Sequence, residues 1–287
     1  MGSTPIVCRH ISFGLCMLSC SQQSLDCNEP IIGTAAESIT RWILIGYAKK
    51  WPTRIKVQDL QISSRLKLEI QKGLQVPNTK LLLIRRPKHD NNTVFLVDSG
   101  VCYRSTAENC SLVDGAGMNK HLEPLILVCT HGTRDRCCAL LGGRFFASMA
   151  KKNPNIVWQA SHLGGHRFAP VALCLPHGVL YGRLQPEDCE QLISGAVHKQ
   201  YVLFDKMRGD TRYSRPVQAA IIAALRKGVT GFTVGQATAH RPNFWTVAVQ
   251  HNQSITFKVH KKLLPTQICT SCVDVAPKDI YGFEVTE

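Results

Sequence analysis

Two short segments in the middle of the chain concentrate side chains that can bind a metal. Cys129 directly follows an apolar run, and Cys138 comes after eight intervening residues. His162 and His166 lie in the second segment, and the three residues between them include a pair of glycines. Glycine lets such a loop turn sharply and lets its backbone approach a bound group closely. The pattern Cys-x8-Cys followed by His-x3-His therefore offers four donors to one metal centre.

Two kinds of centre use such donors, and the spacing leaves both open. A [2Fe–2S] cluster can have two thiolates on one iron and two imidazoles on the other. Its oxidised form would have a formal charge of about zero, against about minus two with four thiolates, so we expect a raised potential. The imidazoles would make that potential depend on pH. Zinc is the alternative, although the gap from Cys129 to Cys138 exceeds the about two to four residues of zinc fingers.

A Rieske-type centre is a further arrangement to weigh, because two pairs imitate its spacing. Cys129 and His131 form a Cys-x-His pair, and Cys174 and His177 form a Cys-x2-His pair. Cys174, however, stands in a continuous apolar run, where a buried structural thiol is the ordinary finding. His177 is expected in a solvated hairpin turn. These two residues therefore argue against a Rieske centre.

The elements that must position these donors follow one order twice along the chain. The first set is a strand at 42–47, a helix at 63–74 and strands at 80–85 and 93–98, followed by a Gly/Ser/Asn-rich stretch at 100–119. The second set is a strand at 124–128, a helix at 137–152, strands at 156–159, 171–175 and 179–184, and a helix from Pro186. A helix at 216–227 and a β-hairpin at 243–249 and 254–258 complete the chain. This order favours an α/β protein with two thioredoxin-like units and a C-terminal appendage.

The predicted boundaries divide the chain into four parts. Residues 1–27 form an N-terminal extension, 28–119 an α/β unit, 120–205 the thioredoxin-like unit with the four donors, and 206–287 the helix and hairpin.

The two central segments resemble those of the sucrase/ferredoxin-like family. The matching motifs are Cys-Thr-His-Gly-x-Arg-Asp-x-Cys-Cys at 129–138 and Ser-His-x-Gly-Gly-His-Arg-Phe-Ala-Pro at 161–170, and the likeness covers roughly residues 20–226. It implies a thioredoxin-like ferredoxin fold and a bis-histidinyl [2Fe–2S] cluster held by Cys129, Cys138, His162 and His166. Arg134, Asp135 and Arg167 would then lie beside the cluster or face a partner. The implied function is one-electron exchange with a flavoprotein or another redox protein.

The remaining thiols give weaker signals. Cys137 stands beside Cys138, and a helix would point the two about 100° apart, so only one is expected to reach the iron. The family spacing favours Cys138 and leaves Cys137 as a core thiol. Cys269 and Cys272 form a Cys-x-x-Cys pair, but an extended segment is expected after it, so we interpret both as peripheral. Four cysteines near the N-terminus match no familiar metal-binding spacing: Cys8, Cys16, Cys20 and Cys27.

Composition limits the other functions. The 287 residues are 44% apolar and 19% charged, which is typical of a globular protein, and no apolar run approaches the roughly 20 residues of a membrane span. With no targeting signal in the N-terminal extension and thiols suited to a reducing compartment, we expect a cytoplasmic protein.

The net charge of +14 comes from scattered basic pairs without interleaved aromatics. It therefore favours steering toward an acidic redox partner over nucleic-acid binding. Sucrose hydrolysis is not supported, because no pair of carboxylates accompanies the segments.

Overall fold

The computed structural model describes residues 18–87, 92–106 and 110–287. Residues 1–17, which include most of the expected N-terminal extension with Cys8 and Cys16, lie outside the described residues. The described part of that extension contains a short helix, α1 (Cys20–Asp26), whose N-cap Ser19 accepts a hydrogen bond from the Gln22 N–H. None of the helices in the described ranges has the length and apolar character needed to cross a membrane.

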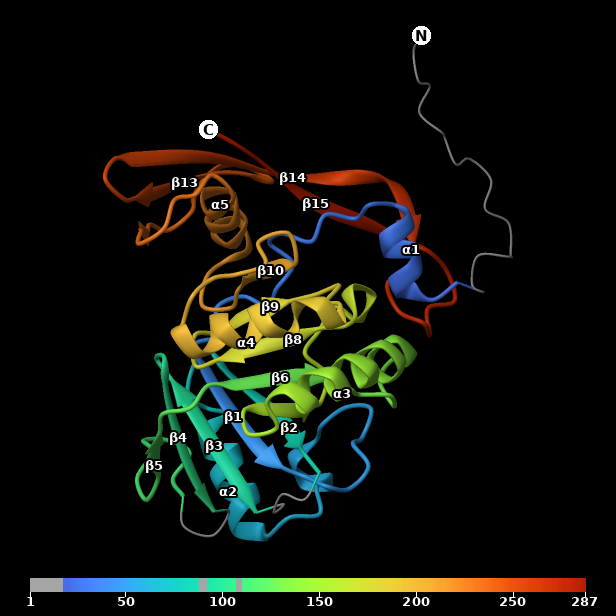
Figure 1. Cartoon of the computed structure of the whole chain (residues 1–287), viewed down its shortest axis with the longest axis vertical. Coiled ribbons are helices and arrows are strands. Elements are labelled where there is room, and N and C mark those ends of the chain that lie inside the picture. The colour runs from blue at the N-terminus through green and yellow to red at the C-terminus, as the bar shows by residue number, and fades with distance from the viewer. Residues whose placement is uncertain (1–17, 88–91, 107–109) are drawn as a thin grey trace.

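A ten-stranded sheet forms the centre of the molecule (Figure 1). Its N-terminal half contains β1 (Arg41–Gly46), β2 (Thr79–Arg85), β3 (Thr93–Asp98), β4 (Val101–Thr106) and β5 (Asn119–His121), with the 3-10 turn Val57–Asp59 and helix α2 (Ser64–Gly73) between β1 and β2. Its other half contains β6 (Leu125–Cys129), β7 (Val157–Ala160), β8 (Ala172–Leu175), β9 (Val179–Tyr181) and β10 (Met207–Asp210). The helices of this half are α3 (Gly143–Lys152) after the π-helical turn Cys138–Gly142, α4 (Cys189–His198) after the 3-10 turn Pro186–Asp188, and the 3-10 turn His166–Phe168.

The two halves repeat one pairing pattern. In the first, β1 pairs in parallel with β2 and antiparallel with β3, which pairs with β4. In the second, β6 pairs in parallel with β7 and antiparallel with β8, which pairs with β9. This is the strand order of a thioredoxin-like unit, so the predicted α/β fold with two such units is confirmed.

The units join through equivalent strands. Ile84 and Arg85 of β2 pair antiparallel with Ala160 and Gln159 of β7, so one sheet crosses both units. No strand was predicted in the Gly/Ser/Asn-rich stretch at 100–119; it contains β4, because Cys102 and its neighbours pair with β3.

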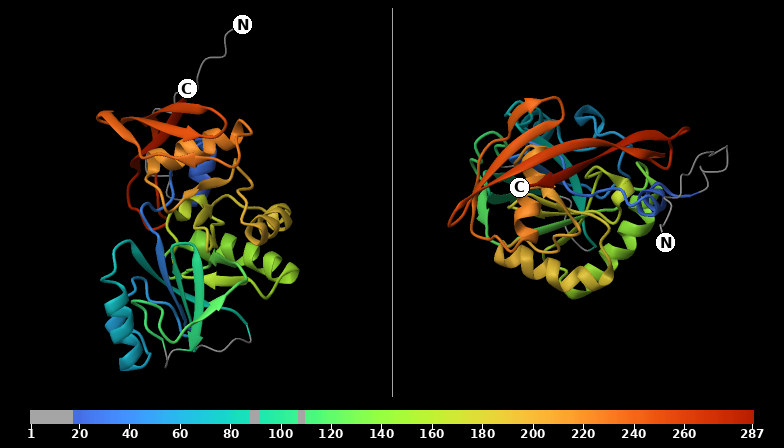
Figure 2. Two further views of the ribbon diagram at one scale, coloured as in Figure 1. Left: turned by 90° about the vertical axis from the view of Figure 1, so that its left-hand side faces the viewer. Right: turned by 90° about the horizontal axis from the view of Figure 1, so that it is seen from above.

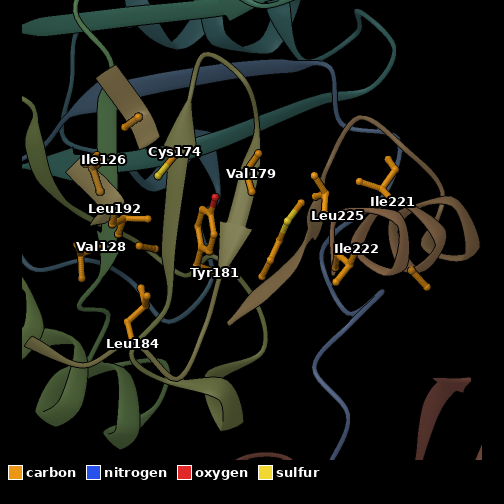
Figure 3. Close-up of a cluster of buried hydrophobic side chains, with 14 of the residues drawn as sticks. Ile126, Val128, Cys174, Val179, Tyr181, Leu184, Leu192, Ile221, Ile222 and Leu225 are labelled. Carbon is orange, nitrogen blue, oxygen red and sulfur yellow. The ribbon is translucent and has the colours of Figure 1, made fainter. Parts of the chain in front are cut away.

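Side chains of β6 alternate between two apolar cores. Ile126 and Val128 face the core shared with α3, α4 and helix α5 (Arg215–Arg226), whereas Leu127 and Cys129 face the core on the other side. Figure 3 shows the first of these cores, with Tyr181 of β9 near Cys174 and Val179 and with Ile221, Ile222 and Leu225 of α5 to the right. Because both faces of β6 are covered, its sequence is a continuous apolar run, and Cys129 ends that run on the side where Cys138 lies.

The predicted C-terminal hairpin, β13 (Phe244–Gln250) and β14 (Ser254–Ile268), belongs to a second sheet. Its other strands are β11 (Thr233–Val234), β12 (Thr238–Arg241) and β15 (Lys278–Thr286). This sheet lies against α5 at one end of the molecule (Figure 2). The end of β14 near Ile268 extends to α1, as Figure 1 also shows, so α1 and the C-terminal sheet are in contact there.

Gly142 lets the turn that carries Cys138 pack directly on the end of β6. A Cβ atom at Gly142 would overlap the carbonyl oxygen of Cys129, whereas one at Gly143 would meet open space. We therefore expect Gly142→Ala to lower the free energy of unfolding by about 1–3 kcal/mol through overpacking. Urea denaturation followed by tryptophan fluorescence measures this. Gly143→Ala is the matched control and should stay within about 1 kcal/mol of the native chain; equal effects of the two changes would contradict the packing argument.

Candidate metal centre

Three of the expected donors converge at the ends of β6 and β7. Cys129 is the last residue of β6, Cys138 begins the π-helical turn, and His162 lies in the loop after β7. One ligand atom from each lies within 4.8 Å of the other two. The thiols are 2% and 1% exposed, so water does not satisfy them. The group has the residue types and proximity that a soft metal requires.

His166 lies next to this group. Its ring centre is 5.0 Å from that of His162, with the planes 32° apart. The Nδ1 atoms of both rings are buried, and neither has a hydrogen-bond partner among the described residues. Buried polar atoms are normally paired, so two unpaired nitrogens on neighbouring imidazole rings fit a pair of metal ligands.

The pKa shifts of Cys129 and His166 favour the forms of these residues that bind metal. The Cys138 thiol donates a hydrogen bond to Cys129, and with help from His162 this holds the pKa of Cys129 well below its usual range despite burial. The same interaction and burial raise the pKa of Cys138. Burial lowers the pKa of His166, against the opposing effect of Asp135. Thiolate and neutral imidazole are the forms that bind metal.

Both ring nitrogens of His131 are hydrogen-bonded, so His131 positions the candidate metal ligand His162 and is not itself a metal ligand. Its Nε2 lies 3.0 Å from the Pro52 carbonyl oxygen, to which it donates, and its Nδ1 accepts a 3.0 Å hydrogen bond from the His162 backbone N–H. Cys174 packs in the core on the opposite face of β6 from Cys129. The Rieske-type arrangement is therefore not formed. His177 is also not simply solvated, because its Nδ1 is buried and burial lowers its pKa to about 4.

The residues expected beside the cluster have different surroundings. Asp135 is 1% exposed, and its Oδ2 lies 3.5 Å from Nε2 of His166. Arg134 closes a turn through its backbone N–H, which donates to the His131 carbonyl. Arg167 donates through Nε to both carboxylate oxygens of Glu29, at 2.8 and 2.9 Å.

Two buried charged residues hold the histidine loop, and sequence reasoning missed both. Glu29 is fully buried and accepts hydrogen bonds from Arg167 and from the Ser24 hydroxyl. Arg208 donates to the Gly164 carbonyl at 2.7 Å and to the Thr34 hydroxyl at 3.1 Å. Neither residue belongs to a local motif, because Glu29 reaches Arg167 and Arg208 reaches Thr34 and Gly164 from distant parts of the sequence.

A second group of thiols lies close by. Sγ of Cys137 is 3.5 Å from that of Cys20 and 3.3 Å from that of Cys272. The interpretation of Cys272 as peripheral was therefore wrong. The segment after it is also not extended: residues 271–274 form a turn, closed by the Asp274 N–H donating to the Ser271 carbonyl. Cys269 is buried as well.

His131 provides a test of how the loop is held. In His131→Leu, the Pro52 carbonyl and the His162 N–H would both lose their partner, and we expect the free energy of unfolding to fall by about 2–4 kcal/mol. Urea denaturation of the metal-free chain measures the loss. His251→Leu, at an exposed turn, is the control and should change stability by no more than about 0.5 kcal/mol. A loss of similar size in both variants would contradict the role given to His131.

Comparison with solved structures finds thioredoxin-like [2Fe–2S] ferredoxins from Aquifex aeolicus. One is 19% identical, with coverage of 30% of this chain and 89% of that chain at a TM-score of 0.26. The wild-type protein in another crystal structure is 17% identical, with coverage of 30% and 95% at a TM-score of 0.25.

Sequence comparison adds a relative and a family. Altered inheritance of mitochondria protein 32 from Meyerozyma guilliermondii is 30% identical over 97 residues, which is 30% of this chain and 34% of that protein. The match thus spans about a third of the relative's length. The pattern of the sucrase/ferredoxin-like family matches residues 31–209, which is more than half of the chain and includes both donor segments. The chain belongs to the sucrase/ferredoxin-like family.

Proposed function

We propose that this protein is a one-electron carrier with a [2Fe–2S] cluster held by Cys129, Cys138, His162 and His166. The observation that supports the proposal is the meeting of two buried thiols with His162, whose ring lies next to that of His166; the buried Nδ1 atoms of both rings have no hydrogen-bond partner among the described residues. When bound, such a cluster supplies a reversible one-electron couple. Membership of a ferredoxin-like family agrees with this chemistry.

Asp135 has a proton-holding part in the proposal. Its carboxylate faces Nε2 of His166 at 3.5 Å, on the side of the ring opposite the unpartnered Nδ1. A negative group at this position favours a proton on Nε2. The charge on His166 can then rise or fall with the electron, which makes the potential depend on pH.

The partner that we propose is an acidic redox protein, such as a flavoprotein reductase. A cavity beside the histidine loop is lined by Gly164 and Gly165, by one acidic side chain, Asp279, and by five basic ones: Lys80, Arg167, Arg208, Arg215 and Lys261. Positive charge next to a redox centre steers an acidic partner toward it and orients the encounter.

The direct test is the metal content and colour of protein prepared without oxygen. We expect a brown sample with sulfide-to-iron charge-transfer absorption and about two irons and two sulfides per chain. Cys138→Ser should lose both iron and colour. Cys174→Ser, a buried thiol on the opposite face of β6, is the matched control and should keep them. A colourless native protein with zinc on Cys129 and Cys138 would instead indicate a structural zinc protein.

The ligand assignment of His166 has its own test. His166→Cys should keep a cluster, but the added thiolate charge should lower the potential by about 100 mV or more and flatten its pH dependence. Redox titration at a series of pH values, followed by visible absorption, measures both effects. His198→Cys, at the exposed end of α4, is the control and should leave the potential unchanged. An unchanged potential in His166→Cys would remove His166 from the ligand set.

A further inference from the structure

Three thiols outside the candidate metal centre form a nearly equilateral triangle. The Sγ–Sγ distances are 3.5 Å from Cys20 to Cys137, 3.3 Å from Cys137 to Cys272 and 3.5 Å from Cys272 to Cys20. The Asp135 carboxylate completes the group, with Oδ1 3.8 Å from Sγ of Cys20. All four donor atoms lie within 4.8 Å of one another.

These donors come from three parts of the chain that are far apart in sequence. Cys20 is the first residue of α1, Asp135 and Cys137 precede the π-helical turn, and Cys272 lies in the turn between β14 and β15. Apolar side chains, Ala169 and Leu141 among them, pack against the thiols, of which Cys20 and Cys137 are buried and Cys272 is partly exposed. Low polarity around soft donors strengthens their attraction for a cation.

From this geometry we propose a second metal site, in which Cys20, Cys137, Cys272 and Asp135 bind one Zn²⁺ ion. With zinc–sulfur bonds of about 2.3 Å, tetrahedral coordination requires Sγ atoms about 3.8 Å apart, whereas flat three-coordination would need about 4.0 Å. The observed edges are closer to the tetrahedral value and leave one position for the carboxylate. A sulfur and an oxygen on the same zinc should be about 3.6 Å apart, which is close to the 3.8 Å found here.

The contacts around the donors hold them in place for a metal. The backbone N–H groups of Cys137 and Cys272 donate to the Asp135 carboxylate at 2.8 and 2.9 Å, as does the Ser271 hydroxyl at 2.9 Å. Sγ of Cys137 also lies 3.3 Å from the Ser21 hydroxyl. Ligating carboxylates in metal sites are usually oriented by hydrogen bonds of this kind.

The structure also offers a path for a metal ion to enter the site and positive charge to balance its ligands. A cavity reaches Cys137 and Cys272 from the surface, and its lining includes Arg136 and Arg144. On binding, each thiol releases its proton to solvent, and the three thiolates with the carboxylate exceed the charge of Zn²⁺ by two. The guanidinium groups of the cavity can balance that excess.

A zinc ion bound here would cross-link α1 and the C-terminal sheet to the unit with the candidate metal centre. The adjacent residues Cys137 and Cys138 would then serve different metals. This inference does not depend on a cluster at the first site, so the experiment must separate the two sites.

Single substitutions made at each site in turn distinguish the two sites. Zinc and iron are measured by mass spectrometry on purified full-length protein. We expect about one zinc per chain in the native protein and a loss of at least about tenfold in Cys20→Ser and Cys272→Ser. Cys27→Ser, at the end of the same helix as Cys20, is the matched control and should keep the zinc. Cys129→Ser should also keep it; if the cluster proposal fails and no iron is found, the zinc measurements can still be interpreted.

Zinc that disappears with Cys129→Ser but persists in Cys272→Ser would overturn the inference, because the ion would belong to the first site. A native protein without zinc, in which Cys137 and Cys272 are joined by a disulfide under anaerobic preparation, would overturn it as well.

A measurement on the native chain covers the case that a variant does not fold. Alkylation mapped by mass spectrometry should find Cys20, Cys137 and Cys272 protected until a zinc chelator is added, and modified together afterwards. Modification that does not respond to the chelator would contradict the site.

Discussion

The buried carboxylate of Asp135 is the interaction on which the arrangement of the centre depends. It accepts hydrogen bonds from the N–H of Cys137, close to it in sequence, and from Ser271 and Cys272 near the C-terminus. It also faces His166. Burial raises the pKa of Asp135, but the hydrogen bonds and the nearby imidazole outweigh burial and leave that pKa below its usual value. A charged carboxylate in the interior must have such partners, because an unpaired one would strongly destabilise the fold.

The shared sheet explains why the donors can lie at one place. Strands β6 and β7 are parallel, so the loops that follow them leave the same edge of the sheet, one with Cys138 and the other with His162 and His166. Strand β2 of the first unit pairs antiparallel with the outer edge of β7, so that edge is not exposed. There the Ser161 hydroxyl accepts a hydrogen bond from the Leu83 N–H, which fixes the start of the histidine loop. The repeat of the unit thus supports the loop in addition to enlarging the core.

The elements that were predicted well are those that bury apolar side chains. The run that forms β6 has both faces in apolar cores, and α2 has an apolar stripe over the first unit, so both were evident in the sequence. Two of the elements that were missed, α1 and β10, bury polar groups. The buried residues of helix α1 are Cys20, Ser21, Gln23 and Ser24. Strand β10 is buried and contains Arg208 and Asp210. Neither has the hydrophobic periodicity on which prediction depends.

By itself, the sequence determined the family and the pattern of Cys129, Cys138, His162 and His166, because the residues of each pair lie within one loop, where spacing limits geometry. Only the tertiary structure decided that His131 accepts a hydrogen bond from His162 and that Cys137 meets Cys20 and Cys272. The physical reason is the range of the contacts. Residues within one loop are restrained by the length of the chain between them, whereas α1, the cysteine loop and the C-terminal turn come together only when the whole core packs.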